Sequence, residues 1–220
     1  MEKKMIDTTF LEQVASGQIK LAPQSLPGDR QRQNENIAII IDRSSSMGLS
    51  CGTTTRLEAA KEAAAALVSA RRRLGAGDEI AVISFNHTAE LACPLTPSTR
   101  ESEILGAIQS IRMDGETDLN APFVLVKDTV GSNRRRMLHI IMLTDGQGGS
   151  PLRTANALKK RGAVIETIGV GHTRSDVDEE LLKKVASVVN KKVLYRFIYD
   201  RDDMVNYFET EIANRLVKWG

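Results

Sequence analysis

The chain has 220 residues, with 30 Lys and Arg against 28 Asp and Glu, and a formal net charge of +2 at pH 7. This length suffices for one large domain with a substantial core, and the near balance of charge gives no indication of a nucleic-acid partner. No apolar stretch approaches the ~18 residues needed to span a bilayer, so we expect a cytoplasmic protein. Cys51 and Cys93 lack metal-site spacing and are predicted to be reduced thiols.

The first part of the chain differs in composition from the rest. Residues 1–33 are polar and broken by prolines and glycines, with a short helix predicted from Thr8 or Thr9 to just before Gly17. We therefore predict an N-terminal leader or edge extension over 1–33 and one domain over 34–220.

Short apolar runs then alternate with longer amphipathic segments, which is typical of α/β proteins. The uninterrupted apolar run Ile37–Ile41 predicts a parallel strand that is covered on both faces, and the alanine-rich segment 56–74 predicts a helix. The remaining predicted elements are strands over 80–85 and 89–95, a helix from Ser98 or Thr99 to 111, a helix over 120–130, a strand over 137–143, a helix over 151–161, a strand over 164–170, a helix over 176–188, a strand over 192–198 and a helix over 202–217.

The connection between 80–85 and 89–95 is short enough for a hairpin, which predicts one antiparallel edge. The predicted fold is therefore α/β: a doubly wound, mostly parallel, Rossmann-like central sheet with one antiparallel edge strand and helices on both faces.

Small oxygen-bearing side chains follow the predicted strands. Asp42, Ser44 and Ser46 sit at i, i+2 and i+4 after the first strand, Asp145 follows the strand over 137–143, and Thr117 lies between them. Ligands of open parallel sheets bind beyond the carboxyl ends of the strands, so these side chains are expected to converge there.

Two carboxylates and three hydroxyls form a donor set for a hard cation such as Mg²⁺, with Mn²⁺ or Ca²⁺ as alternatives. This set leaves at least one coordination position open. We expect an Asp or Glu side chain of a partner protein to fill it.

The same residues carry a resemblance to a known family. Asp42-x-Ser44-x-Ser46-Met47-Gly48, Gly115-x-Thr117-Asp118 and Thr144-Asp145-Gly146 resemble the metal-ion-dependent adhesion site (MIDAS) of von Willebrand factor type A domains, bacterial members above all. The resemblance implies that Ser44, Ser46 and Thr117 contact the metal directly or through water, with Asp42 and Asp145 on the other side. It also implies a protein-interaction module that is not an enzyme.

Three further residues in or beside these motifs, Ser45, Asp118 and Asn120, are interpreted separately. Ser45 stands where many members have glycine, and it is expected to stiffen the loop. Asp118 and Asn120 either orient Thr117 through hydrogen bonds or cap the following helix.

Other polar residues have structural interpretations. The triplet Arg71–Arg73 is predicted to end a helix, where cations oppose the helix dipole, and 134–136 is predicted to be a solvated flank. His139, inside an apolar strand, is predicted to be a hydrogen-bonded core residue.

Two alternative functions stay open. The chain could be a metal-assisted hydrolase or phosphoryl-transfer enzyme on the same fold, although no D-x-D pair or G-x-S-x-G elbow appears in the sequence. It could also be a structural domain that binds an incidental cation.

Overall fold

The computed structural model of the protein describes residues 34–74, 77–130 and 136–215. The predicted leader over 1–33 and its helix near Thr8 or Thr9 lie outside the described residues. The boundary predicted at residue 33 therefore stays a prediction.

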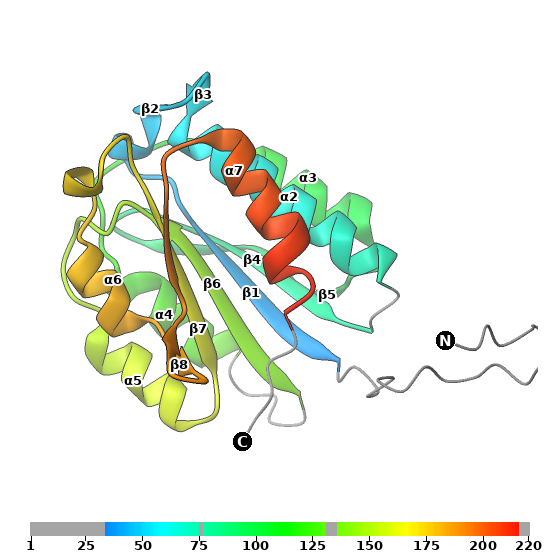
Figure 1. Cartoon of the computed structure of the whole chain (residues 1–220). Helices are drawn as coiled ribbons and strands as arrows, with labels where there is room; N and C mark the ends of the chain where they lie inside the picture. Colours follow the sequence, from blue (N-terminus) through cyan, green and yellow to red (C-terminus); the bar gives the residue numbers. More distant parts are fainter. Residues whose placement is uncertain (1–33, 75–76, 131–135, 216–220) are drawn as a thin grey trace, which may run out of the picture. The chain divides into compact units, whose positions relative to one another are not determined.

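A six-stranded sheet runs through the molecule in the order β10-β7-β6-β1-β4-β5 (Figure 1). All neighbouring strands are parallel except the edge strand β5, which is antiparallel to β4. The predicted mostly parallel, doubly wound sheet with one antiparallel edge is confirmed. The strands are β1(Glu35–Asp42), β4(Glu79–Phe85), β5(Ala89–Pro97), β6(Met137–Thr144), β7(Val164–Val170) and β10(Tyr195–Ile198).

β1 lies between two parallel neighbours and is buried along its whole length. Ile37 and Ile39 belong to the apolar cluster on one face of the sheet, whereas Ala38 and Ile40 belong to the cluster on the other face. Successive side chains of a strand point to opposite faces, so a strand covered on both sides is continuously apolar. This double coverage explains the uninterrupted run in the sequence.

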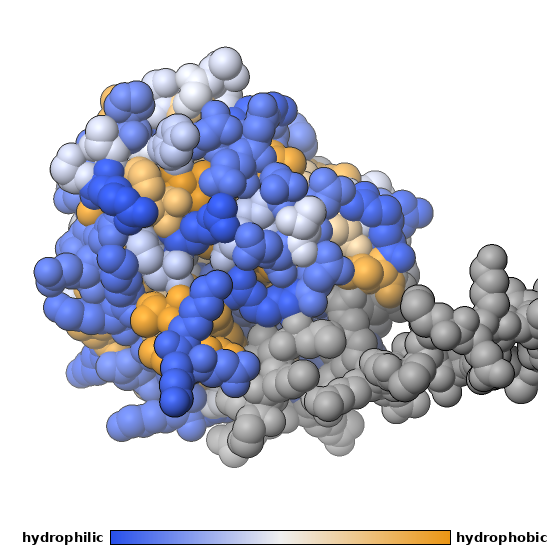
Figure 2. All heavy atoms as spheres, in the orientation of Figure 1, coloured by the Kyte–Doolittle hydropathy of each residue, from blue (hydrophilic) through white to orange (hydrophobic). Residues whose placement is uncertain are grey.

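Helices cover both faces of the sheet (Figure 1), and the side of the molecule seen in Figure 2 is mostly hydrophilic, with hydrophobic residues in separate patches. One face is covered by α2(Arg56–Arg73), α3(Glu101–Ser110), α7(Arg201–Asn206) and the π-helix η4(Tyr207–Ile212). The other face is covered by α4(Asn120–Thr129), α5(Leu152–Lys160) and α6(Glu179–Val185). Within the described ranges, no helix has both the length and the apolar character required to cross a bilayer.

α2 is the longest described helix, and its first residues lie beside the carboxyl edge of the sheet (Figure 1). The hydroxyl of Thr55 accepts a hydrogen bond from the Glu58 amide at 3.2 Å and caps the helix. The side chains that face the core are small, since Ala59, Ala60 and Ala63 are all fully buried. A side-chain cap and an alanine-rich inner face therefore determine where α2 begins and how it lies on the sheet.

Two boundaries and one loop differ from the prediction in the first half of the chain. β5 extends to Pro97, and the Ser98 amide continues the ladder by donating to the Asp78 carbonyl at 2.9 Å. α3 consequently begins at Glu101 and is not capped by Ser98 or Thr99. The glycine- and threonine-rich loop after β1 contains the helix η1(Ser45–Gly48) and a small hairpin of β2(Ser50–Cys51) and β3(Thr54–Thr55).

The helix predicted over 176–188 is divided and shorter. A 3-10 turn η3(Arg174–Asp176) comes first, and α6 begins only after Asp178, whose carboxylate accepts from the Leu181 amide at 3.0 Å. α6 ends at Val185 because the Ser187 amide donates back to Ile165 of β7 at 2.8 Å.

The strand predicted over 192–198 is also divided. Its first part forms a hairpin of β8(Val188–Val189) and β9(Lys192–Val193), and only the rest is the sheet strand β10. The final helix begins at Arg201, as predicted within one residue, but it continues as the π-helix η4; positions 216 and 217 lie outside the described residues.

A candidate metal site at the carboxyl edge of the sheet

Three loops meet at the carboxyl edge of the sheet. β1 ends at Asp42 and its neighbour β6 ends at Thr144, while the segment 114–118 precedes α4. The strand order reverses at β1, because the chain continues to β4 on one side and later to β6 on the other. This is the position at which open α/β sheets bind their ligands.

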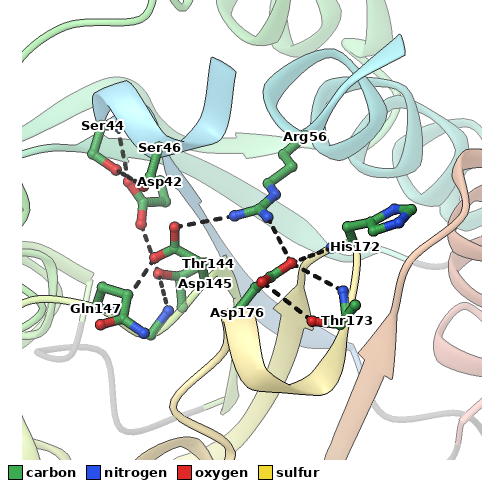
Figure 3. A network of polar contacts seen from close by, with 11 residues as sticks. Asp42, Ser44, Ser46, Arg56, Thr144, Asp145, Gln147, His172, Thr173 and Asp176 are labelled. Carbon is green, nitrogen blue, oxygen red and sulfur yellow. Dashed lines mark hydrogen bonds and ion pairs between the residues drawn. The ribbon is translucent and has the colours of Figure 1, made fainter. Parts of the chain in front are cut away.

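Asp42 is fully buried at the end of β1. Its Oδ1 accepts the Ser44 amide at 2.9 Å, and its Oδ2 accepts the Thr144 hydroxyl at 2.6 Å (Figure 3). Burial raises the pKa of the Asp42 carboxyl to about 6, helped by the charge of Asp145 and opposed by the hydrogen bonds of Ser44 and Thr144. Hydrogen bonds therefore hold the Asp42 carboxylate in place, but its negative charge is poorly balanced by nearby positive charge.

The two predicted serine ligands lie side by side on the same loop. Ser44 is buried and Ser46 is half-buried, and their hydroxyl oxygens are 3.2 Å apart. Between them, Ser45 donates to the Gly115 carbonyl through both its amide, at 3.0 Å, and its hydroxyl, at 2.9 Å. Ser45 thus links the first loop to the second.

Thr117 is positioned by residues on either side of it. Asn86, directly after β4, donates from its side chain to the Asp114 carbonyl at 3.0 Å, and its backbone carbonyl accepts the Asp118 amide at 2.8 Å. Gly148, three residues after Asp145, packs against Thr117, because a Cβ at Gly148 would lie 2.4 Å from the Thr117 carbonyl oxygen. The segment that carries Thr117 is therefore fixed between the other two loops.

Asn86 and Gly148 were not identified from the sequence. Gly148 has a φ of +127°, a backbone conformation that favours glycine. This angle is visible only in the structure, so the sequence did not identify the residue. For Asp118 the structure favours the capping role, since its carboxylate accepts the Asn120 amide at 2.9 Å at the start of α4. The Asn120 side chain accepts the Thr154 hydroxyl at 2.7 Å.

Asp145 faces Arg56, an arginine that was not singled out from the sequence. Asp145 Oδ1 accepts the Gln147 amide at 3.2 Å, and its Oδ2 lies 3.5 Å from Arg56 Nη1. The other terminal nitrogen of Arg56 lies 3.2 Å from Asp176 Oδ2, so the guanidinium joins two carboxylates (Figure 3). Arg56 is buried at the first position of α2.

The donor chemistry of this arrangement fits a hard divalent cation. Neighbouring ligands of an octahedral Mg²⁺ lie about 3 Å apart when the bonds are about 2.1 Å long, and the Ser44 and Ser46 oxygens are 3.2 Å apart. Buried Asp42 supplies a carboxylate whose charge lacks a cationic partner among the described residues. In the same ranges, no group of three or more His, Cys, Asp or Glu side chains is placed to hold a metal ion.

Comparison with known proteins agrees with this architecture. The family model for the von Willebrand factor type A domain matches residues 37–147, from β1 to the loop after β6. Among curated relatives, the "Uncharacterized protein sll0103" of Synechocystis sp. is 26% identical over 172 residues, which is 74% of this chain and 39% of that protein. The "Uncharacterized protein YfbK" of Escherichia coli is 27% identical over 191 residues, which is 83% of this chain and 31% of that protein. The chain thus spans well under half the length of these relatives.

Solved structures share the fold. BatB from Bacteroides thetaiotaomicron superposes with a TM-score of 0.67 at 20% identity, covering 82% of this chain and 98% of that one. Proximal thread matrix protein 1 from the mussel byssus, described with a zinc-occupied MIDAS motif, superposes with a TM-score of 0.68 at 23% identity, covering 83% and 46%. The matched family model spans half of the chain, including both strands that end at the candidate site. The chain therefore belongs to the von Willebrand factor type A domain family.

Proposed function

We propose that the protein holds one hard divalent cation, Mg²⁺ with Mn²⁺ or Ca²⁺ as alternatives, through Asp42, Ser44, Ser46, Thr117 and Asp145. One observation carries this proposal. The buried carboxylate of Asp42 and the hydroxyl oxygens of Ser44 and Ser46, which are 3.2 Å from each other, lie where the strand order of the sheet reverses. The zinc-occupied MIDAS motif of the mussel protein supports a divalent ion at this place in the fold.

We further propose that the site captures an Asp or Glu side chain of a partner protein. A divalent cation held by only two carboxylates supplies an open, electrophilic coordination position that favours an incoming anion. Exposed apolar side chains flank the site: Leu49 follows η1 and is 56% exposed, and Met113 is 51% exposed. Met113 lies against Gly48, where an added Cβ would be 2.5 Å from its sulfur. Apolar contacts around a central charged contact are typical of protein interfaces.

The first experiment is calorimetric titration of Mg²⁺, Mn²⁺ and Ca²⁺ into metal-free protein. We expect one ion per chain, and we expect Asp145→Ala to abolish binding because it removes one of the two anionic ligands. Asp114→Ala is the matched control, since the Asp114 side chain is 72% exposed and contacts Arg43 at 3.7 Å. A wild-type protein that binds no ion, or an Asp145→Ala variant that binds as tightly as wild type, would contradict the proposal.

The second experiment tests the carboxylate. Peptides that differ only in Glu against Gln at one position are applied to the immobilised protein with Mg²⁺ or with EDTA. We expect retention of Glu peptides in Mg²⁺ alone. Turnover of generic phosphate or ester substrates that is lost in Asp42→Ala would instead support the alternative of a metal-assisted hydrolase or phosphoryl-transfer enzyme.

The free, buried thiols of Cys51 and Cys93 are compatible with the proposed cytoplasmic location.

A further inference from the structure

Arg56 makes an unusual pair of contacts beside the candidate site. Its Nη1 lies 3.5 Å from Asp145 Oδ2, at the limit of a hydrogen bond, and its Nη2 lies 3.2 Å from Asp176 Oδ2. Figure 3 shows the guanidinium between the two carboxylates. Asp145 is thus held loosely by a cation that has a second and closer acceptor.

The position of Arg56 is electrostatically unfavourable without these acids. It is the first residue of the 18-residue helix α2, at the positive end of the helix dipole, and its side chain is only 4% exposed. Its Nε has no hydrogen-bond partner among the described residues. A buried cation at such a position depends on its carboxylate partners, and here these are Asp145 and Asp176.

Asp176 belongs to a different loop, which connects β7 to α6. Besides Arg56, its Oδ2 accepts the amides of His172 and Thr173, both at 2.9 Å, and its Oδ1 accepts the Thr173 hydroxyl at 3.2 Å (Figure 3). The loop 172–176 is therefore organised around the same carboxylate that shares Arg56 with the candidate site.

We propose that Arg56 is a positioning residue that competes with the cation for Asp145 and moves to Asp176 alone when Asp145 is engaged, so that occupancy of the site is transmitted to the loop 172–176. This inference rests on the proposed function, because it assigns regulation to that same site. The charges are consistent with it. Two carboxylates, Asp42 and Asp145, formally neutralise a divalent cation, which leaves Arg56 and Asp176 as a second neutral pair.

The competition predicts opposite effects of two substitutions. Arg56→Met removes the competing cation and should lower the Mg²⁺ Kd at least fivefold, the lower end of usual coupling between sites. Asp176→Asn removes the second acceptor, leaves Arg56 on Asp145 and should raise the Kd at least fivefold. In the double variant, Asp176→Asn should have no further effect, because the residue through which it acts is gone.

The Kd values are measured by calorimetry, with urea unfolding as a check that each variant folds. Asp176→Asn keeps the test decisive if Arg56→Met does not fold, since the Asp176 side chain is 35% exposed. Arg174→Met is the matched control: it removes the same charge from a neighbouring arginine that pairs with Glu179, and it should leave the Kd unchanged. Addition of Mg²⁺ should also shift the amide resonances of His172 and Thr173 in wild type but not in Arg56→Met.

The outcomes separate the two proposals. If wild type binds Mg²⁺ and Asp145→Ala does not, but Arg56→Met and Asp176→Asn both leave the Kd unchanged or both raise it, the role of Arg56 is overturned and the metal site stands. If wild type binds no Mg²⁺, both proposals are overturned.

Discussion

At the scale of single residues, the three arginines that end α2 have different environments. The Arg71 side chain is fully buried and pairs with Glu35 at 2.7 Å and with Asp78 at 3.2 Å. The Arg72 and Arg73 side chains are more than half exposed and pair with acids on α3 and η4. All three arginines lie in the last turn of α2, as predicted, and Arg71 in addition neutralises two carboxylates beneath the helix end.

We predict that Arg71→Met lowers the free energy of unfolding by about 3–5 kcal/mol, because it leaves Glu35 and Asp78 without their buried cation. Arg72→Met is the matched control, and the loss there should be at most about 1 kcal/mol because the Arg72 side chain is 58% exposed. Urea unfolding of both variants measures the difference. Equal losses would show that Arg71 contributes no more than a surface arginine.

The candidate site was predictable to the extent that its signal is local. Asp42, Ser44 and Ser46 lie two positions apart, so their spacing in the sequence already indicated a shared direction. Arg56 meets Asp145 across 89 positions and Asp176 across 120 positions. Nothing in one sequence specifies such a pairing, because it depends on where the ends of helix and strands meet in space.

At the scale of elements, a buried polar cluster joins the π-helix η4 to the sheet. Tyr207 donates to Glu166 of β7 at 2.6 Å, and Arg215 lies 3.1 Å from the same carboxylate. His139 of β6 is buried, as predicted, but neither ring nitrogen has a hydrogen-bond partner among the described residues; its Nε2 lies 3.4 Å from Glu166 Oε2. The close polar contact of His139 is thus with Glu166, which is the centre of the cluster.

The pH dependence of stability should report on this cluster. Burial raises the pKa of Glu166, but His139, Arg215 and Tyr207 outweigh it and lower the pKa below its usual 4.5. A carboxyl whose pKa is lower in the folded state contributes stability above its unfolded pKa, and that contribution is lost as the pH falls through the folded pKa. We therefore predict that wild type exceeds Glu166→Gln in stability from pH 7 down to about pH 4.5.

The difference should be about 1.5–3 kcal/mol, as for hydrogen bonds to charged groups, and should disappear at lower pH. Urea unfolding at several pH values measures it. Glu211→Gln is the control, since Glu211 pairs with Arg196 at 3.0 Å with half of its side chain exposed. A gap between wild type and Glu166→Gln that stayed constant to pH 3 would exclude ionised Glu166 as its source.

Elements with strong periodicity were predicted well, whereas those decided by tertiary contacts were not. β1 and α2 follow directly from an apolar run and an alanine-rich segment. The β8–β9 hairpin depends on Asn190 and Lys191, both with positive φ, and the sequence alone did not separate it from β10. The π-helix η4 was predicted as ordinary helix, because its side-chain pattern does not encode the extra residue per turn.

At the scale of the whole molecule, the topology determines where the candidate site lies. The strand and helix alternation in the sequence was enough to predict a doubly wound sheet, and hence a site at its carboxyl edge. Residues 42–46, 117 and 145 come from three loops that only the folded chain brings together. A cation that binds all three loops should therefore bind the native state and have little affinity for the unfolded chain.

This difference in affinity predicts that Mg²⁺ stabilises the whole domain. At a free Mg²⁺ concentration 100 times its Kd, the free energy of unfolding should rise by about 2.7 kcal/mol over that in EDTA. Asp42→Ala should abolish the increase, because Asp42 connects the cation to the central strand β1, whereas Asp114→Ala should retain it. Urea unfolding with and without Mg²⁺ measures all three proteins. An increase that persists in Asp42→Ala would mean that Mg²⁺ stabilises the fold from elsewhere, and the three loops would then have no common ligand.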